Sequence, residues 1–189
     1  GVRMARELNG IPCFELQETR PYKKSIMTSR SFKREITSFR ALNEVLSNFA
    51  SLCALKLRNQ RTRAKKLVVF IQTNRFKPDI KSHYGSLEIE FPVATNDSIE
   101  IIKSTYVALD KLYDKYCSYK RAGVMLTEIS SDQEIQLNLF TENNIEKRVK
   151  LMKVYDDVNR KMGEGTLRLS IQGIENKWAP NQAPIAFGN

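Results

Sequence analysis

The chain holds few side chains that could carry out catalysis. Its one histidine, His83, stands in a polar stretch between Lys81 and Tyr84, so any triad that needs an imidazole depends on a residue with surroundings typical of a protein surface. Asp156 and Asp157 are the only adjacent acidic pair, and on a helix they point about 100° apart, whereas two-metal phosphoryl transfer needs convergent carboxylates. No glycine-rich phosphate loop is present. The residues therefore predict a non-catalytic chain.

The cysteines also lack the clustering that a metal site needs. Cys13, Cys53 and Cys117 are far apart and form no Cys-x-x-Cys pair, which argues against structural zinc. Cys53 and Cys117 fall in helical patterns, where a small buried residue is expected. We expect no metal or cofactor in this chain and a reducing, cytoplasmic location. No stretch approaches the 18 apolar residues of a spanning helix, so no membrane partner is expected.

The net charge of +10 is concentrated in one part of the chain. Residues 131–189 hold 8 of the 31 basic and 8 of the 21 acidic residues, so the whole excess lies in residues 1–130. Residues 20–81 alone contain 16 basic and 3 acidic side chains. Such a local field favours a polyanion, with nucleic acid first and an anionic membrane surface second. A soluble basic protein without a specific partner is the alternative.

The strongest binding signal lies in a predicted strand from Lys23 to Phe32. One side of this strand carries Lys24, Ile26, Thr28 and Arg30, and the other carries Ser25, Met27, Ser29 and Ser31. Small hydroxyl residues let a phosphate approach backbone amides, while lysine and arginine supply charge. Lys120 and Arg121 open the last predicted strand, and the two basic sets could converge. A merely solvated sheet face is the alternative. Aromatic residues are sparse on these two strands, which favours backbone contact over base stacking.

The elements that must position these residues follow the order β-α-β-β-α-β. Strands are expected at 23–32, 67–73, 84–91 and 119–129, with helices at 39–59 and after the capping residue Asp97. The first helix has a buried stripe at Leu42, Leu46, Phe49, Ala50, Cys53 and Leu57, capped by Thr37 or Ser38. The second has one at Ile102, Tyr106, Leu109, Tyr113 and Tyr116. This predicts an α+β, ferredoxin-like domain with both helices on one sheet face, leaving the other face bare for binding.

After Ser130 the sequence changes character. The pentapeptide Gln136-Leu137-Asn138-Leu139-Phe140 places apolar anchors among polar residues, as a docking peptide would. Alternatively, it packs on the chain's own helix, expected at 144–162 and ending at Gly163. A short strand is expected at 166–171 and an irregular tail from Asn176. The predicted regions are 1–20, 21–130 and 131–189.

Several ordered blocks resemble the UmuC-like branch of the Y-family lesion-bypass DNA polymerases. The matching blocks are Glu7-Leu8-Asn9-Gly10-Ile11-Pro12-Cys13, Lys24-Ser25-Ile26-Met27-Thr28-Ser29-Arg30-Ser31-Phe32, Tyr119-Lys120-Arg121-Ala122-Gly123-Val124-Met125-Leu126, Gln136-Leu137-Asn138-Leu139-Phe140, Leu151-Met152-Lys153-Val154 and Gly165-Thr166-Leu167-Arg168. The resemblance covers nearly the whole chain. It implies the end of a thumb region at 1–20, a little finger domain at 21–130, and a C-terminal region at 131–189 with the docking peptide, a helix and a short strand.

The resemblance also implies which residues meet which partners. The little finger of such polymerases lays its open sheet face against duplex DNA, damaged or primer-template, and contacts mainly phosphates. Matched onto this chain, the contacts fall on Lys24, Ser25, Thr28, Arg30, Ser31, Lys120 and Arg121. The pentapeptide looks like the family's sliding-clamp-binding motif, with Gln136, Leu137, Asn138, Leu139 and Phe140 as its residues.

For the parent protein, the resemblance implies an error-prone translesion DNA polymerase of SOS-type damage tolerance in the bacterial cytoplasm. A UmuD-like dimer and RecA would be further partners, without assigned residues. The catalytic palm and its Mg²⁺ would lie outside this chain, which opens without an initiator methionine, so we expect the chain alone to be inactive. The stretch after Trp178 departs from the family pattern, which puts a tail-specific role in doubt. The competing hypothesis is a protein-interaction module whose basic sheet face binds an acidic partner.

Overall fold

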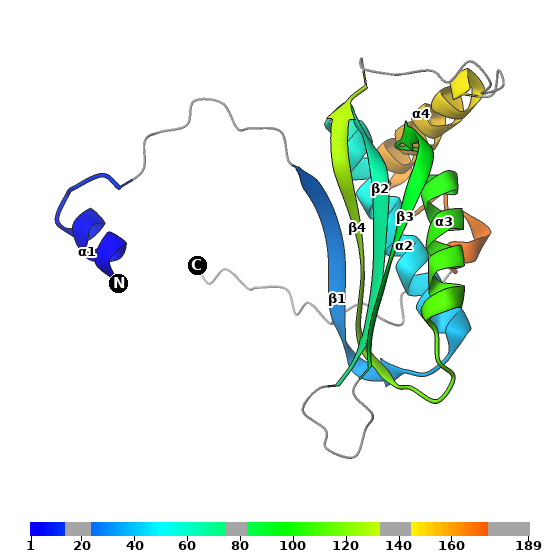
Figure 1. The fold of residues 1–189 in the computed structure, drawn as a ribbon. Helices are drawn as coiled ribbons and strands as arrows, with labels where there is room; N and C mark the ends of the chain where they lie inside the picture. Colours follow the sequence, from blue (N-terminus) through cyan, green and yellow to red (C-terminus); the bar gives the residue numbers. More distant parts are fainter. Residues whose placement is uncertain (14–23, 75–82, 133–144, 174–189) are drawn as a thin grey trace, which may run out of the picture.

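The computed structural model describes residues 1–13, 24–74, 83–132 and 145–173 (Figure 1). Its elements are α1 (Val2–Leu8), β1 (Ser25–Ile36), α2 (Phe39–Asn59), β2 (Thr62–Thr73), β3 (Tyr84–Thr95), α3 (Ser98–Leu112), β4 (Tyr119–Ser131), α4 (Ile145–Met162) and a 3-10 turn, η1 (Ser170–Gln172). No helix in these ranges combines the length and apolar character needed to cross a membrane.

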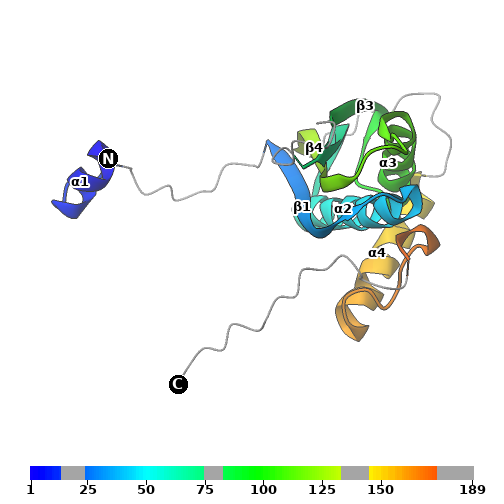
Figure 2. The ribbon, with the colours of Figure 1, turned by 90° about the horizontal axis from the view of Figure 1, so that it is seen from below.

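The four strands form one sheet in the order β1-β4-β2-β3, and every neighbouring pair is antiparallel. Each helical crossover therefore skips a strand: α2 links β1 to β2 across β4, and α3 links β3 to β4 across β2. Figures 1 and 2 show α2 and α3 together on one face of the sheet. The predicted β-α-β-β-α-β order with both helices on one face is confirmed, and the first and last strands are direct neighbours.

Local sequence explains where the two main helices begin and what they bury. The Ser38 side chain accepts a hydrogen bond from the Ala41 amide at the start of α2, and Asp97 accepts one from Ile99 at the start of α3. The predicted stripe of α2 is buried in the core from Leu42 to Leu57. These helices are stabilised mainly by that burial against the sheet.

The predicted stripe of α3 is only partly right. Ile102 and Leu109 are buried, but Tyr106 is 42% and Tyr116 is 85% exposed. The helix ends at Leu112, so Tyr116 lies beyond its last turn. The buried face is completed instead by Ile101, Thr105 and Ala108, on the side of α3 that packs against α2 and the sheet.

The C-terminal helix packs on the outer side of α2 (Figure 2). The helix predicted at 144–162 is confirmed, and Gly163 follows it with a φ of 108°. The short strand predicted at 166–171 is wrong. There the side-chain oxygen of Gln172 accepts a hydrogen bond from the Leu169 amide at 2.8 Å, which closes the 3-10 turn. Leu169 and Ile171 then pack against the core without a partner strand.

Candidate nucleic-acid interface

Strand pairing arranges the open face of the sheet in four rows. Alternate positions such as Leu67, Val69 and Val124 are buried under the helices, so their neighbours point to the open face. From β1 to β3 the rows are Ser25–Thr127–Lys66–Glu90, Met27–Met125–Val68–Glu88, Ser29–Gly123–Phe70–Ser86 and Ser31–Arg121–Gln72–Tyr84. On this face, β1 thus carries Ser25, Ser29 and Ser31, and β3 carries Glu90 and Glu88 in the first two rows.

The predicted DNA-binding residues of β1 divide between its two faces. Ser25 and Ser31 lie on the open face and are exposed, and Lys24 is exposed just before the strand. Thr28 and Arg30 share the side of Ile26, which faces the helices. The Thr28 hydroxyl is there bonded by Cys53 Sγ at 3.2 Å and Lys56 Nζ at 3.4 Å. Because β1 is an edge strand, both faces border the same free edge.

The two basic residues of β4 reach back to β1, where they contact Ser29 and Lys33. Arg121 stands opposite Ser31 and donates from Nη2 to the Ser29 hydroxyl at 3.2 Å. Lys120 Nζ donates to the backbone carbonyl of Lys33 at 3.3 Å. These contacts gather residues about 90 positions apart in the sequence.

Among the basic residues at this edge that were not predicted to bind, Lys56 lies outside the sheet. Lys56 is exposed on α2, and its ammonium reaches the hydroxyl of Thr28 on β1. Its position three residues after the buried Cys53 was the available signal, because it places Lys56 on the flank of the helix beside the sheet.

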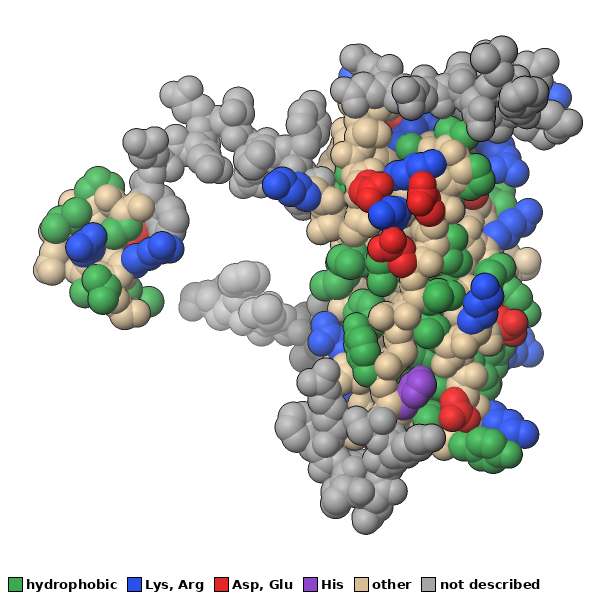
Figure 3. Space-filling model, viewed as in Figure 1, with side chains coloured by type: hydrophobic (Ala, Val, Ile, Leu, Met, Phe, Trp, Pro, Cys, Tyr) green, Lys and Arg blue, Asp and Glu red, His purple; other side chains and the backbone are tan. Residues whose placement is uncertain are grey.

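Ion pairs lie at one end of the open face, around the row that contains Thr127, Lys66 and Glu90. Lys66 Nζ lies 2.7 Å from Glu128 and 3.4 Å from Glu88, and Lys65 lies 3.6 Å from Glu90. The hydrogen bond and charge of Glu128, with the charge of Glu88, raise the pKa of Lys66. Figure 3 shows acidic and basic side chains gathered over the upper part of the sheet. The positive field available to a polyanion is therefore displaced toward the β1–β4 edge.

The open face also carries aromatic side chains that the first and last strands do not supply. Phe70 on β2 and Tyr84 on β3 stack with ring centroids 6.5 Å apart. The Arg121 guanidinium lies over Phe70 at 5.8 Å from the ring centroid. Base stacking was not expected because aromatic residues are sparse on β1 and β4, whereas these two rings lie on β2 and β3.

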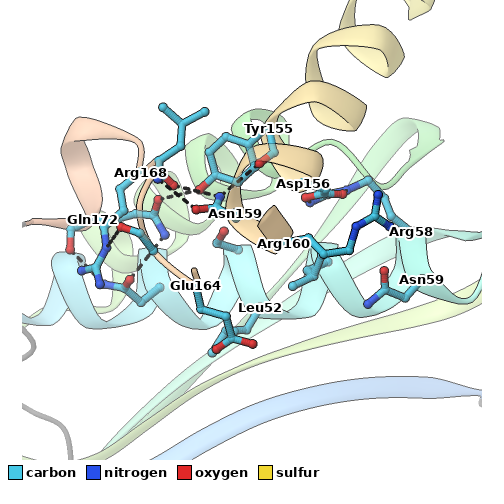
Figure 4. A pocket seen from close by; sticks show the side chains of 15 residues that line it. Leu52, Arg58, Asn59, Tyr155, Asp156, Asn159, Arg160, Glu164, Arg168 and Gln172 are labelled. Carbon is cyan, nitrogen blue, oxygen red and sulfur yellow. Dashed lines mark hydrogen bonds and ion pairs between the residues drawn. The ribbon is translucent and has the colours of Figure 1, made fainter. Parts of the chain in front are cut away.

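A cavity of about 440 Å³ lies between α2, α4 and the turn η1 (Figure 4). Its polar walls are largely paired with one another: Arg58 grips both carboxylate oxygens of Asp156, and Asn48 bonds the backbone of Gln172. Because these polar groups bond to one another, the cavity is better explained as part of the interface between α2, α4 and η1 than as a catalytic site. Within the described ranges, no three His, Cys, Asp or Glu side chains cluster so that they could hold a metal ion.

The predicted clamp-binding residues Gln136 to Phe140 lie outside the described residues.

Comparison with protein families gives two matches along the chain. Residues 23–139 match the impB/mucB/samB family C-terminal domain, and residues 149–184 match a domain of unknown function, DUF4113. The first match spans β1 to β4 and continues past the last strand.

Three curated relatives agree with the first match. The chain is 35% identical to protein UmuC of Salmonella typhimurium over 94% of its length, and 35% identical to protein MucB of Escherichia coli over the same share. Protein SamB of Salmonella typhimurium is 34% identical over 93%. The chain spans about two fifths of the length of these relatives, 42% in each case.

Solved structures with similar folds are more distant. An insertion ternary complex of Dbh DNA polymerase aligns with 60% of this chain and 32% of its own, at 16% identity and a TM-score of 0.42. A complex of the beta-clamp processivity factor and the little finger domain of PolIV aligns over 62% of this chain and 99% of the matched chain, at 12% identity and a TM-score of 0.43.

Proposed function

The chain belongs to the impB/mucB/samB family, and we propose from this premise that it is the DNA-binding and sliding-clamp-docking part of an error-prone translesion DNA polymerase of SOS-type damage tolerance. The observation that carries the DNA-binding half is the pairing of β1 with β4. It brings Arg121 beside Ser29 and Ser31, and Lys120 beside Lys33, along one free sheet edge.

Phosphate contact at this edge follows from the chemistry of its groups. An edge strand keeps backbone N–H groups without a strand partner, and the exposed serines of β1 leave room for a phosphate to reach them. Lys24, Arg30 and Arg121 supply charge, and all three side chains are exposed. The carboxylates paired on β3 and β4 keep the polyanion on the β1 side. Contact of this kind fixes the position of duplex DNA, primer-template or damaged, without reading its sequence.

A salt series tests the phosphate contact. Binding of the chain to duplex DNA should weaken steeply with salt, and Arg30→Ala or Arg121→Ala should each weaken binding at low salt and lower the slope of log K against log [salt] by about 1. Lys103→Ala is the matched control, because Lys103 is exposed on α3, in the helical layer. Affinity that does not change with salt, or an equal loss in the control, would refute the phosphate contact.

The clamp-docking half rests on the pentapeptide Gln136 to Phe140. Its apolar residues are surrounded by polar ones in the sequence, and they come after the last residue of β4, so they are not part of the sheet. Replacing Leu139 and Phe140 together by alanine should abolish binding to a bacterial sliding clamp, because buried anchors carry most of the energy of such an interface. Thr141→Ala, the next residue, is the control. Undiminished binding of the double variant would exclude the peptide as the anchor.

Synthesis itself is assigned to the remainder of a longer polymerase. The palm of that protein would hold Mg²⁺, and a UmuD-like dimer and RecA would be its further partners in the bacterial cytoplasm. This chain with primer-template DNA, nucleotides and Mg²⁺ should extend no primer. Extension by the chain alone would overturn the assignment.

A further inference from the structure

We propose that Phe70 and Tyr84 form a stacking platform for an unpaired nucleobase of single-stranded DNA on the open face of the sheet. The inference rests on the proposed DNA contact and adds to it a ligand class and a site. Phosphate contact alone would leave the bases of the bound DNA untouched, whereas this site would bind a base that has left the duplex.

The rings occupy adjacent strands and adjacent rows of the open face. Phe70 on β2 and Tyr84 on β3 are diagonal neighbours, with centroids 6.5 Å apart and planes inclined by 30°. Arg121 on β4 approaches Phe70 from the other diagonal, 5.8 Å from the ring centroid. A cation and two rings thus follow one another across three strands.

Gly123 explains how the ring of Phe70 comes to lie against the sheet. A Cβ at this position would lie 2.4 Å from Cζ of Phe70 and 2.5 Å from Cβ of Ser29. The glycine therefore leaves the space that the edge of the Phe70 ring occupies over β4. A glycine in a strand interior weakens the strand, so filling its place with a ring compensates for the missing side chain.

Of the two rings, Tyr84 is exposed to solvent and Phe70 is half-buried. Tyr84 is 59% and Met27 is 49% exposed. Met27 shares a row of the open face with Met125 and Val68, which are half-buried, so the face has an apolar surface beside Phe70. Figure 3 shows apolar side chains on this face of the sheet. Exposed apolar side chains grouped in this way mark binding sites. Every base has a π-face, so stacked aromatic residues bind bases without sequence preference.

Charge complementarity selects single-stranded DNA as the occupant. Arg121 links the platform to Ser29 and thus to the basic β1 edge, so a phosphate bound there would direct its base toward Phe70. On the other side, the ammonium of Lys66 is already paired with Glu88 and Glu128, so it offers no free charge to a second phosphate. A strand would therefore enter from the β1 edge and place a base, not its backbone, over the rings.

The test compares two ligands that differ only in their bases. An oligothymidine of about eight nucleotides and an abasic strand of the same length carry the same phosphates. The chain should bind the thymidine strand more tightly, by about 5-fold or more if one base stacks. Tyr84→Ala should remove this preference while leaving affinity for the abasic strand unchanged, and Tyr84→Phe should retain it. Tyr116→Ala, which changes a tyrosine 85% exposed beyond α3, should have no effect.

The outcomes separate this inference from the proposed function. Equal binding of the two ligands with a steep salt dependence would overturn the platform and leave the phosphate contact standing. An equal loss for both ligands in Tyr84→Ala would also overturn it. Absence of binding to either strand and to duplex DNA would refute the DNA contact and the platform together. Phe70→Leu keeps the apolar volume but removes the ring, so it should also reduce the preference for the thymidine strand. Circular dichroism of each variant shows whether a loss of binding comes from unfolding.

Discussion

Replacing Arg58 by methionine should loosen the attachment of α4 to the sheet domain. Arg58 lies at the end of α2 and donates from Nε and Nη2 to the two carboxylate oxygens of Asp156 on α4, at 2.6 and 2.7 Å. Its Nη1 donates to the Asn96 carbonyl at 2.7 Å and to the Ser98 hydroxyl at 3.0 Å, at the start of α3. One guanidinium therefore joins three helices, as Figure 4 shows for Asp156.

The burial of the pair sets the magnitude. The side chains of Arg58 and Asp156 are 11% and 21% exposed, so removing one leaves the other charge largely shielded from water. Breaking a buried pair costs about 3–5 kcal/mol, and the remaining exposure puts Arg58→Met at about 3 kcal/mol. Asp156→Asn should cost about 1–2 kcal/mol, because Arg58 keeps its bonds to Asn96 and Ser98 and can still donate to the amide oxygen.

Urea unfolding followed by circular dichroism measures these free energies. Asp157→Asn is the matched control: Asp157 is the next residue on α4 and pairs with Arg160 on its own helix, and their side chains are 37% and 76% exposed. Such a pair contributes less than about 0.5 kcal/mol. If Asp157→Asn cost as much as Asp156→Asn, or if Arg58→Met cost less than about 1 kcal/mol, the reasoning from the bidentate contact would be refuted.

Two further predictions concern the sheet and its core. Gly123→Ala should lower the free energy of unfolding by about 1–3 kcal/mol, because the added Cβ would overlap Phe70 and Ser29. The loss should be smaller when Phe70 is replaced by leucine. Urea unfolding measures both, and a neutral effect of Gly123→Ala would contradict the close packing. Burial raises the pKa of the Cys53 thiol, so at pH 8 iodoacetamide should label the half-exposed Cys13 well before Cys53, as mass spectrometry of peptides would show; equal rates would contradict that burial.

Features set by local sequence could be predicted well. The helix expected at 39–59 has the same limits as α2, because its apolar spacing, the cap at Ser38 and the polar residues after Asn59 all lie within a few positions of one another. The failure at 166–171 has the converse cause. An alternation of apolar residues predicts a strand only where a neighbouring strand can pair with it, and Gln172 instead satisfies the Leu169 amide.

Features set by strand register could not be predicted. The ion pairs of Lys66 join β2 to Glu88 on β3 and Glu128 on β4, and nothing in the sequence of one strand indicates the other two. The strand expected at 67–73 lies within β2, an interior strand, but its apolar residues follow one another without alternation, so the sequence does not show which of them face outward. Phe70 proved to be one of them, and its ring fits only because Gly123 stands opposite in the register.

The order of the strands therefore determines where on the sheet the basic side chains are concentrated. β1 stands at one edge with exposed basic and hydroxyl side chains, and β3 stands at the other with Glu88 and Glu90. The positive charge of the open face is therefore greatest at the β1 edge and smallest at the β3 edge. Arg121 on β4 places a positive charge one strand further in, over the ring of Phe70. Had β4 paired at the β3 edge, Arg121 would have met carboxylates instead of serines. In the proposed DNA contact, the polyanion would therefore lie along the β1 edge, and a base that its backbone directs inward would meet the rings of Phe70 and Tyr84.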